Sequence, residues 1–330
     1  MASRVINVYP YFCNQGGAQN VVLQLAEGLN SSFPIVLISN PIKDVPQQYR
    51  ERADYMPLSL SNVMTLANNK TTFISHHRKT TLILLLYQKL LFKKLSIVHV
   101  AHNTFSNFKW ATFFPKICIA VSHTVKQNMI DYFKVPEENI TVIYNGVKDL
   151  ANEDILNISQ SERINILFAG RLCKVKHQVV IAEYLQDKIP SHVHLYFAGT
   201  GEDKDALTKI VCKNKQMHYL GQIELQEEIN NMHYVILFSE KEGLPLTLLE
   251  ACMFGRPMLT NAIPAATEIN INGETGIVYQ DIHSFAEGLK NIPLPGSDVY
   301  ERYSKNARER YERQFQENIM IEQYKKVLQL

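Results

Sequence analysis

The chain has 330 residues, 46% of them hydrophobic and 20% charged, which is typical of a folded globular protein and excludes a disordered chain. It is longer than one hydrophobic core usually organises, so we expect two domains. No run of about 18 apolar residues is present, and the five cysteines are scattered. These features argue against a membrane span, a disulfide framework and a zinc site.

The start of the chain, MASRVINVYPYF, lacks the basic, apolar and small-residue blocks of a signal peptide. Scattered, unpaired cysteines favour a reducing compartment. We therefore expect a cytoplasmic protein.

The charge is unevenly distributed, although the net charge is only +2. Residues 1–150 hold 15 lysines and arginines against 8 acidic residues, and no acidic residue occurs from Tyr55 to Ile130. Such a basic half indicates an anionic partner, which can be a phosphate, a membrane surface or a nucleic acid, unless it reflects composition alone.

Apolar runs of strand length alternate with helical patterns along the first half of the chain. Strands are predicted over 5–12, 34–39, 71–77, 96–105, 116–121 and 139–147. A helical pattern follows the first strand and another covers 80–95. Ser122 is placed as the N-cap of a further helix.

The same alternation starts again after a polar segment at 147–162, which reads as a linker. Strands are predicted over 164–172, 192–203, 217–223, 234–239, 256–262 and 275–280, and a long helix over 297–330. Because these strands are almost continuously apolar, both faces of each sheet should be covered by helices. The sequence therefore predicts two doubly wound parallel α/β domains.

Polar residues and glycines collect where the predicted strands end, which is the edge at which open parallel sheets bind ligands. One such stretch is EGLPLTLLE, with Glu242 and Glu250 at its ends. Pro245 suits the first turn of a helix, which places Glu242 in a loop and Glu250 about one turn into the helix. The backbone N–H groups of residues 243–247 would then form an anion site.

Glu250 needs a partner because an unpaired charge in an apolar helix is costly. Sugar hydroxyls of a ligand would serve, and the alternative is a capping glutamate with a surface ion pair. The two carboxylates could also be the acid and base of a glycoside hydrolase.

Other strand ends carry cations, glycines and one histidine. Arg171 and Lys176 in GRLCKVKH could neutralise a diphosphate, or they are solvated surface residues. Two glycine turns, NQGG and GTG, allow close backbone approach to a ligand, although neither matches GxGxxG. His102 ends a strand, and Asp203 fits a helix start better than a metal site.

These stretches carry a resemblance to the family-4 retaining glycosyltransferases, which have the GT-B fold. EGLPLTLLEACMFGRPMLT resembles the family's signature block, in which two glutamates are separated by seven residues. Further blocks match in the same order: GGAQ, AVSHTVKQNM, VIYNGV, FAGRLCKVK, YFAGTGED, YLGQI and NGETGIV.

The resemblance implies two Rossmann-like domains facing a central cleft. Residues 1–148 would form the acceptor-side domain, residues 149–312 the nucleotide-sugar-binding domain, and residues 313–330 a helix crossing back to the first domain.

The resemblance also implies residue roles. Arg171 and Lys176 would bind the donor diphosphate, and Glu242 would meet hydroxyls of the transferred sugar. His102 would lie close to the sugar carbon that reacts. Glu250 would hold the ribose hydroxyls through its carboxylate. Other residues would contact the donor mainly through backbone groups: Gly16, Gly17, Gly199, Gly201, Gly243, Leu244, Pro245, Leu246 and Thr247.

Two positions depart from the family pattern. His177 stands where a glycine usually follows the lysine, which bears on the shape of that loop. Lys148 stands where an aspartate usually follows NGV, which bears on the hinge.

The implied activity is retaining transfer of a hexose or N-acetylhexosamine from a nucleotide-diphosphate sugar, with UDP favoured by its frequency in the family. The acceptor would be a hydroxyl of a glycan or glycolipid in bacterial cell-surface polysaccharide synthesis. We predict no metal, no cofactor and no nucleic acid partner. The alternatives are a nucleotide-sugar epimerase of similar fold and a non-enzymatic protein that binds an anionic ligand.

Residues 76–95, HHRKTTLILLLYQKLLFKKL, combine lysines with a leucine-rich helix. This segment could rest on anionic lipid at the inner face of the cell membrane, or its leucines could belong to the core.

Overall fold

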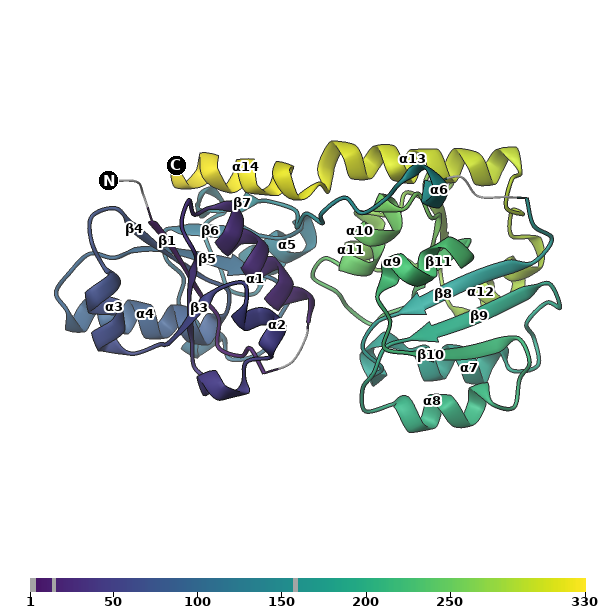
Figure 1. Ribbon diagram of the computed structural model, residues 1–330, viewed down its shortest axis with the longest axis horizontal. Helices are drawn as coiled ribbons and strands as arrows, with labels where there is room; N and C mark the ends of the chain where they lie inside the picture. The colour runs from purple at the N-terminus through teal and green to yellow at the C-terminus, as the bar shows by residue number, and fades with distance from the viewer. Residues whose placement is uncertain (1–3, 14–15, 157–159) are drawn as a thin grey trace. The chain divides into compact units, whose positions relative to one another are not determined.

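The computed structural model describes residues 4–13, 16–156 and 160–330 (Figure 1). The chain divides into two compact units. The first unit combines Met1–Gly146 with Glu317–Leu330, and the second unit is Val147–Gln316.

The first unit contains a seven-stranded sheet in the order β3-β2-β1-β4-β5-β6-β7, and every neighbouring pair in it is parallel. The strands are β1 (Arg4–Val8), β2 (Ile35–Ile38), β3 (Asp54–Pro57), β4 (Thr71–Ser75), β5 (Ser96–Ala101), β6 (Ile117–Ala120) and β7 (Ile140–Val142). β3 escaped the sequence analysis because its four residues, DYMP, include a proline and an exposed aspartate.

The helices of the first unit are α1 (Gly17–Gly28), α2 (Gln47–Arg50), α3 (Leu60–Leu66), α4 (Arg78–Leu90), α5 (His123–Asp131) and α14 (Glu317–Leu328), with 3-10 turns η1 (Ile42–Asp44), η2 (Lys109–Ala111) and η3 (Glu137–Asn139). Ser122 caps α5 as predicted, because its hydroxyl accepts a hydrogen bond from the Val125 amide at 3.1 Å.

Side chains of the first sheet alternate between two buried clusters, one on each face. Val36 and Ile38 pack with residues of α1 and α2, whereas the intervening Leu37 packs with residues of α3 and α4. This alternation buries both faces of the sheet and explains the continuous apolar runs of its strands.

The second unit contains a six-stranded parallel sheet in the order β10-β9-β8-β11-β12-β13. Its strands are β8 (Ile164–Ala169), β9 (Val193–Ala198), β10 (Met217–Gly221), β11 (Tyr234–Leu237), β12 (Met258–Asn261) and β13 (Gly276–Tyr279). All six end one to five residues before the predicted limits, because the polar and glycine residues that follow form the loops.

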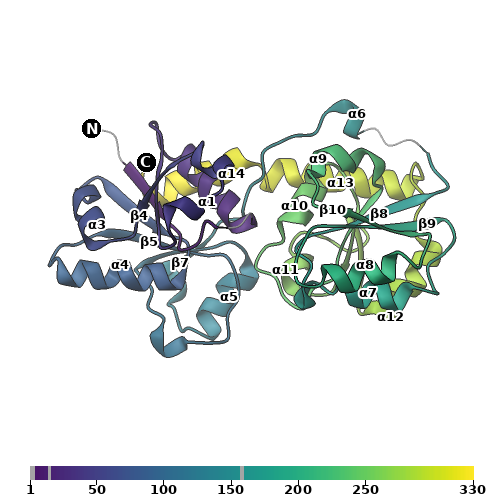
Figure 2. The same ribbon diagram turned by 60° about the horizontal axis from the view of Figure 1, so that its bottom comes forward.

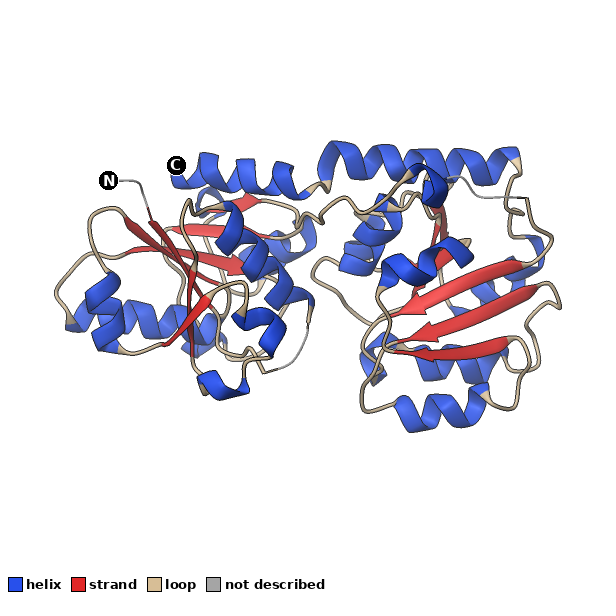
Figure 3. Ribbon diagram, viewed as in Figure 1, coloured by secondary structure: helices blue, strands red, loops and turns tan. Residues whose placement is uncertain are grey.

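The helices of the second unit are α6 (Glu153–Leu156), α7 (Gln178–Leu185), α8 (Lys204–Val211), α9 (Leu225–Glu228), α10 (Leu246–Met253), α11 (Pro264–Thr267), α12 (Ile282–Gly288) and α13 (Asp298–Gln314), with 3-10 turns η4 (Lys174–Lys176), η5 (Ile229–Asn231) and η6 (Leu289–Asn291). Figure 3 shows helices on both sides of the strands. The prediction of two parallel α/β domains is confirmed.

The C-terminal segment is two helices, so the prediction of one continuous helix over 297–330 is wrong. α13 ends at Gln314 because Phe315 is fully buried in the second unit, where its carbonyl accepts the Val147 amide at 2.9 Å. α14 then packs in the first unit against α1 (Figure 2). A Cβ atom at Gly28 of α1 would lie 2.4 Å from Cδ1 of Ile321, so the two helices approach closely there.

Each sheet reverses its strand order at one point, between β1 and β4 in the first unit and between β8 and β11 in the second. Loops diverge at such a switch point and leave room for a ligand beyond the strands' carboxyl ends. Within the described residues, no helix is both long and apolar enough to cross a membrane.

The junction residue Lys148 is exposed, and the following residue, Asp149, accepts two hydrogen bonds from Arg308 of α13 at 2.6 and 3.0 Å. An acidic residue is thus present at this junction one position later than the family pattern places it.

The contact of α14 with α1 yields a stability prediction. Ile321→Ala should lower the free energy of unfolding by roughly 2–4 kcal/mol, because it leaves a cavity at a buried position. The exposed neighbour Gln323→Ala is the matched control. Urea unfolding measures both, and equal stability of the two variants would contradict the packing described.

Candidate functional site

Two polar clusters lie at the switch points, one in each unit. The cluster of the second unit is built from the loop after β8, which holds Arg171 and Lys176, and the loop after β11, which holds Glu242.

Three contacts tie these two loops together. Lys176 Nζ donates to Glu242 Oε1 at 2.5 Å, and the Glu240 amide donates to the Val175 carbonyl at 2.9 Å. His177 Nε2 lies 3.3 Å from Glu240 Oε1. Two residues that the sequence analysis assigned to one ligand are therefore held together by an ion pair.

The loop after β11 is also fixed from the opposite side by Asn261 at the end of β12. Its side chain accepts from the Ser239 amide at 3.2 Å and donates to the Ser239 carbonyl at 2.9 Å. The Ser239 hydroxyl is buried without a hydrogen-bond partner among the described residues. Sequence reasoning missed both residues, because a pairing across 22 positions has no local signal.

Arg171 extends from the end of the β8 loop with its side chain exposed. Its carbonyl accepts a hydrogen bond from Gln178 Nε2 at 3.2 Å, which fixes the backbone. In the part of the chain that the structure describes, its guanidinium forms no ion pair. It can therefore offer two parallel N–H donors to an anion.

α10 begins directly after the Glu242 loop. Pro245 is the N-cap and Leu246 is the first helical residue, so the expectation that proline occupies the first turn is wrong by one position. The amides of Leu246 and Thr247 have no acceptor within the helix. Gly243, Leu244 and Pro245 are buried, whereas Leu246 and Thr247 are partly exposed.

Glu250 lies in the second turn of α10 and is partly exposed. Burial and, to a smaller extent, the Glu224 carboxylate raise its pKa to about 7. Among the described residues, none donates a hydrogen bond or an ion pair to its carboxylate. The alternative of a surface ion pair is therefore wrong, and the carboxylate remains available to a ligand.

Gly199 and Gly201 have steric reasons to be glycine. A Cβ atom would lie 1.9 Å from the Gly170 carbonyl oxygen at Gly199, and 2.0 Å from the Leu172 carbonyl oxygen at Gly201. Both residues let the loops after β8 and β9 pack backbone against backbone. Their identity is thus explained by packing, without a ligand.

His177 adopts the left-handed conformation, with φ 56° and ψ 17°, immediately before α7. This conformation favours glycine, and histidine tolerates it better than most other residues do. His177 therefore occupies a conformation that a glycine at this position would also favour.

The cluster of the first unit is a chain of hydrogen bonds from the sheet to His102. His76 Nε2 lies 2.8 Å from Asn7 Oδ1, and His76 Nδ1 lies 2.9 Å from His102 Nε2. Asn7 belongs to β1, His76 follows β4 and His102 follows β5, so this series of hydrogen bonds bridges the switch point. The sequence offered SHH as a strand end but could not show which histidine turns inward.

His76 and His102 are both neutral at pH 7. Burial lowers the pKa of His102 to about 4 and that of His76 well below its ordinary value. With Asn7 Oδ1 directed at the ring, His76 is assigned a proton on Nε2, since that oxygen only accepts, and the bare Nδ1 of His76 then accepts from His102 Nε2–H. His102 is left with Nδ1 as an acceptor.

The remaining predicted residues of the first unit begin α1. Gly16 is the N-cap in an extended conformation, and Gly17 is the exposed first helical residue. Asn14 and Gln15 of the same turn lie outside the described residues.

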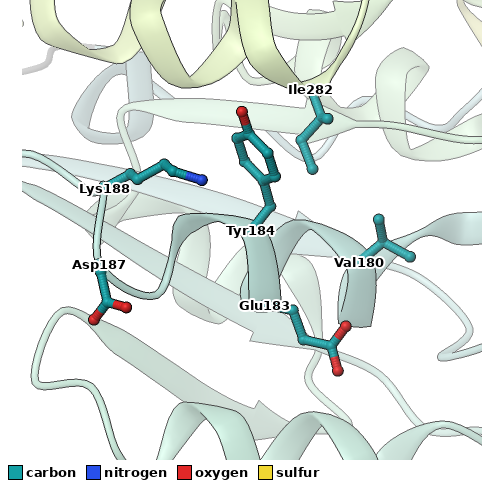
Figure 4. Close-up of a pocket in the computed structure, with 6 residues that line it drawn as sticks. All are labelled: Val180, Glu183, Tyr184, Asp187, Lys188 and Ile282. Carbon is teal, nitrogen blue, oxygen red and sulfur yellow. The ribbon is translucent and has the colours of Figure 1, made fainter.

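A depression of about 450 Å³ lies elsewhere in the second unit, between α7 and the start of α12 (Figure 4). Lys188 lies over the ring of Tyr184, 3.6 Å from its centroid. None of the predicted site residues lines this depression. No group of three or more potential metal-ligating side chains occurs in the described ranges.

The hydrogen-bond chain predicts specific tautomers. Long-range ¹H–¹⁵N NMR should show His76 and His102 protonated on Nε2 and not titrating between pH 6 and 8. Asn7→Leu should change the His76 tautomer and cost roughly 1–3 kcal/mol of stability, because a buried N–H loses its acceptor. Asn69→Leu, at an exposed position of the same unit, is the control. A proton on His102 Nδ1 in the wild-type protein would refute the assignment.

The raised pKa of Glu250 predicts a pH dependence of stability. The carboxyl group of Glu250 keeps its proton up to about pH 7 in the folded state but loses it near pH 4.5 in the unfolded state. The free energy of unfolding should therefore fall as the pH rises from about 4.5 to 7. Glutamine does not titrate, so the free energy of unfolding of Glu250→Gln, taken relative to wild type, should rise by on the order of 1 kcal/mol between pH 5.5 and pH 8.5, after allowance for solvent screening. Urea unfolding measures this, with exposed Glu274→Gln as control; parallel profiles would rule it out.

The family comparison covers most of the chain. Residues 15–149 match the model described as Glycosyltransferase Family 4, and residues 163–292 match the model described as Glycosyl transferases group 1.

Relatives in sequence are distant. The chain is 24% identical over 295 residues to uncharacterized glycosyltransferase MJ1069 of Methanocaldococcus jannaschii, covering 79% of this chain and 74% of that protein. It is 24% identical to the O-antigen biosynthesis glycosyltransferase WbnH of Escherichia coli, covering 60% of this chain and 56% of the relative.

Solved structures share the fold over the full length. Alr3699/HepE of Anabaena in complex with UDP superposes with a TM-score of 0.84 at 14% identity, covering 99% of both chains. The lipopolysaccharide outer core galactosyltransferase WaaB has a TM-score of 0.78 at 18% identity, covering 98% of this chain and 99% of the other. The chain therefore has the GT-B fold and belongs to the family-4, group 1 glycosyltransferases.

Proposed function

We propose that this glycosyltransferase moves a hexose or N-acetylhexosamine from a UDP-sugar to a hydroxyl of a cell-surface glycan or glycolipid, with retention of the anomeric configuration. The observation that carries the proposal is the convergence of Arg171, the Lys176–Glu242 pair and the start of α10 at one switch point. The Anabaena protein of the same fold was solved with UDP and with UDP-glucose, which supports the nucleotide.

The charge that develops on the leaving diphosphate is the main electrostatic demand of such a reaction. Arg171, Lys176 and the N–H groups of Leu246 and Thr247 would meet that charge in positions fixed before the substrate binds. Lys176 is already held by Glu242, so it loses little side-chain freedom when a phosphate replaces part of that contact.

The two glutamates would take different parts of the donor. Glu242 would accept hydrogen bonds from hydroxyls of the transferred sugar while it orients Lys176. Glu250 would accept from the ribose hydroxyls, and these donors would favour its ionised form over the neutral one. Gly199 and Gly201 would keep the neighbouring loops close enough together for this arrangement.

The first unit would supply the acceptor side. The neutral His102, with Nδ1 free to accept, would receive a hydrogen bond from a sugar or acceptor hydroxyl near the reacting carbon. Gly16 and Gly17 would bring the start of α1 close to the phosphate and the acceptor.

The α4 segment supports a peripheral membrane contact through residues 76–95, at the cytoplasmic face. Leu86, Leu90 and Phe92 are 48%, 64% and 98% exposed, and Lys89, Lys93 and Lys94 lie beside them. Leu84 is buried, so the helix divides its leucines between the core and the surface. An exposed apolar stripe with lysines is typical of interfacial helices.

Arg171→Ala should lower kcat/KM with a UDP-sugar by about 10²–10³-fold, because it removes a donor to the leaving diphosphate, and it should leave the fold intact. Lys174→Ala, on an exposed side chain of the same loop, is the matched control. A panel of nucleotide sugars, scored by thermal shift and by product analysis, measures the effect. Full activity of folded Arg171→Ala would overturn the role, and donor conversion without acceptor would indicate an epimerase.

A further inference from the structure

We infer that the loop of residues 103–116, between β5 and β6, inserts aromatic side chains into the headgroup region of an anionic bilayer. The inference rests on the membrane contact proposed above and names a different segment as the inserting element.

Three large aromatic side chains point outward within six positions of this loop. Phe108, Trp110 and Phe113 are 63%, 83% and 56% exposed. Lys109 and Lys116 are exposed beside them, and the loop contains no acidic residue. Isolated exposed aromatics are ordinary, whereas three on one loop form an apolar patch that favours a partner.

The loop is held rigidly from the inside. Arg78, the first residue of α4, donates from Nη1 to the Asn107 carbonyl at 2.9 Å and from Nη2 to Asn107 Oδ1 at 3.0 Å. Its guanidinium lies 3.9 Å from the centroid of the Phe105 ring. Phe114 packs edge-on against His99. The inward aromatics thus anchor the loop, and the outward aromatics are presented by a fixed backbone.

Phe108 adopts the left-handed conformation, with φ 54°. This region is unfavourable for a bulky side chain, at a cost of about 1 kcal/mol or more. The exposed Phe92, directly after the last turn of α4, has φ 48° in the same region. Neither ring is buried in the unit, so packing of the rings does not account for these two conformations.

The surroundings favour lipid over a sugar or a protein as that partner. Aromatic rings with lysines are the side chains that settle at a membrane interface, and each lysine near an anionic surface contributes about 1 kcal/mol. Aromatic rings can also stack on sugars, but this loop has no carboxylate to accept hydrogen bonds from sugar hydroxyl groups. From Tyr55 to Ile130 the chain carries nine basic residues and no acidic residue that would be repelled by anionic lipid.

Trp110 is the only tryptophan in the chain, so its fluorescence reports on this loop alone. With vesicles of equal parts phosphatidylglycerol and phosphatidylcholine at low salt, we expect a blue shift of the emission and quenching by brominated lipid. Pure phosphatidylcholine should give a smaller change. The double variant Phe108→Ser/Phe113→Ser should bind these vesicles at least about tenfold more weakly in flotation. Phe33→Ser, 55% exposed between α1 and β2, should bind as wild type does.

Each result separates the loop from the broader proposal. The wild-type protein could float with the vesicles while Trp110 emission does not change, or while the double variant binds equally well. Either result would overturn insertion by the loop and leave contact through α4. No flotation of wild type would overturn both membrane proposals, while UDP-induced thermal shift would still test the donor site. A Trp110 response to soluble oligosaccharide but not to vesicles would identify a glycan surface and reject the lipid.

Discussion

The junction of two loops at the β8–β11 switch point is the constraint on which the proposed donor site depends. The Lys176–Glu242 ion pair and the hydrogen bond from the Glu240 amide to the Val175 carbonyl join segments that are more than 60 residues apart. Asn261 fixes the same β11 loop from β12. With both loops held, a cation, a carboxylate and a helix start occupy defined positions before any ligand arrives, which is what electrostatic stabilisation of a leaving group requires.

In the first unit, the polar groups at the switch point are held in place by hydrogen bonds between uncharged side chains. Burial is the main cause that keeps His76 and His102 uncharged. Asn7 starts a hydrogen-bond chain that sets which nitrogen of each ring carries the proton. The unit thereby combines a polar but uncharged strand edge with a strongly basic exterior, where Arg78 secures the aromatic loop.

Local patterns were sufficient for much of the fold. Parallel sheets follow from apolar runs separated by helical patterns, and the cap at Ser122 follows from its place between a strand and a helix. The signature blocks identified the family, which the comparisons confirm. Local patterns failed where long-range packing decides: the helix break at Phe315 depends on burial of its ring and on the Val147 amide, far away in sequence.

The sequence by itself determined the fold class, the family and the residue types at the strand ends, because these depend on periodicity and short-range spacing. Only the tertiary structure decided that Lys176 binds Glu242, that Glu250 has no partner among the described residues, that Gly199 and Gly201 are required by packing, and that His76 stands between Asn7 and His102. Each of these facts depends on which loops a parallel sheet brings together, and strand order is a property of the whole unit rather than of any short stretch.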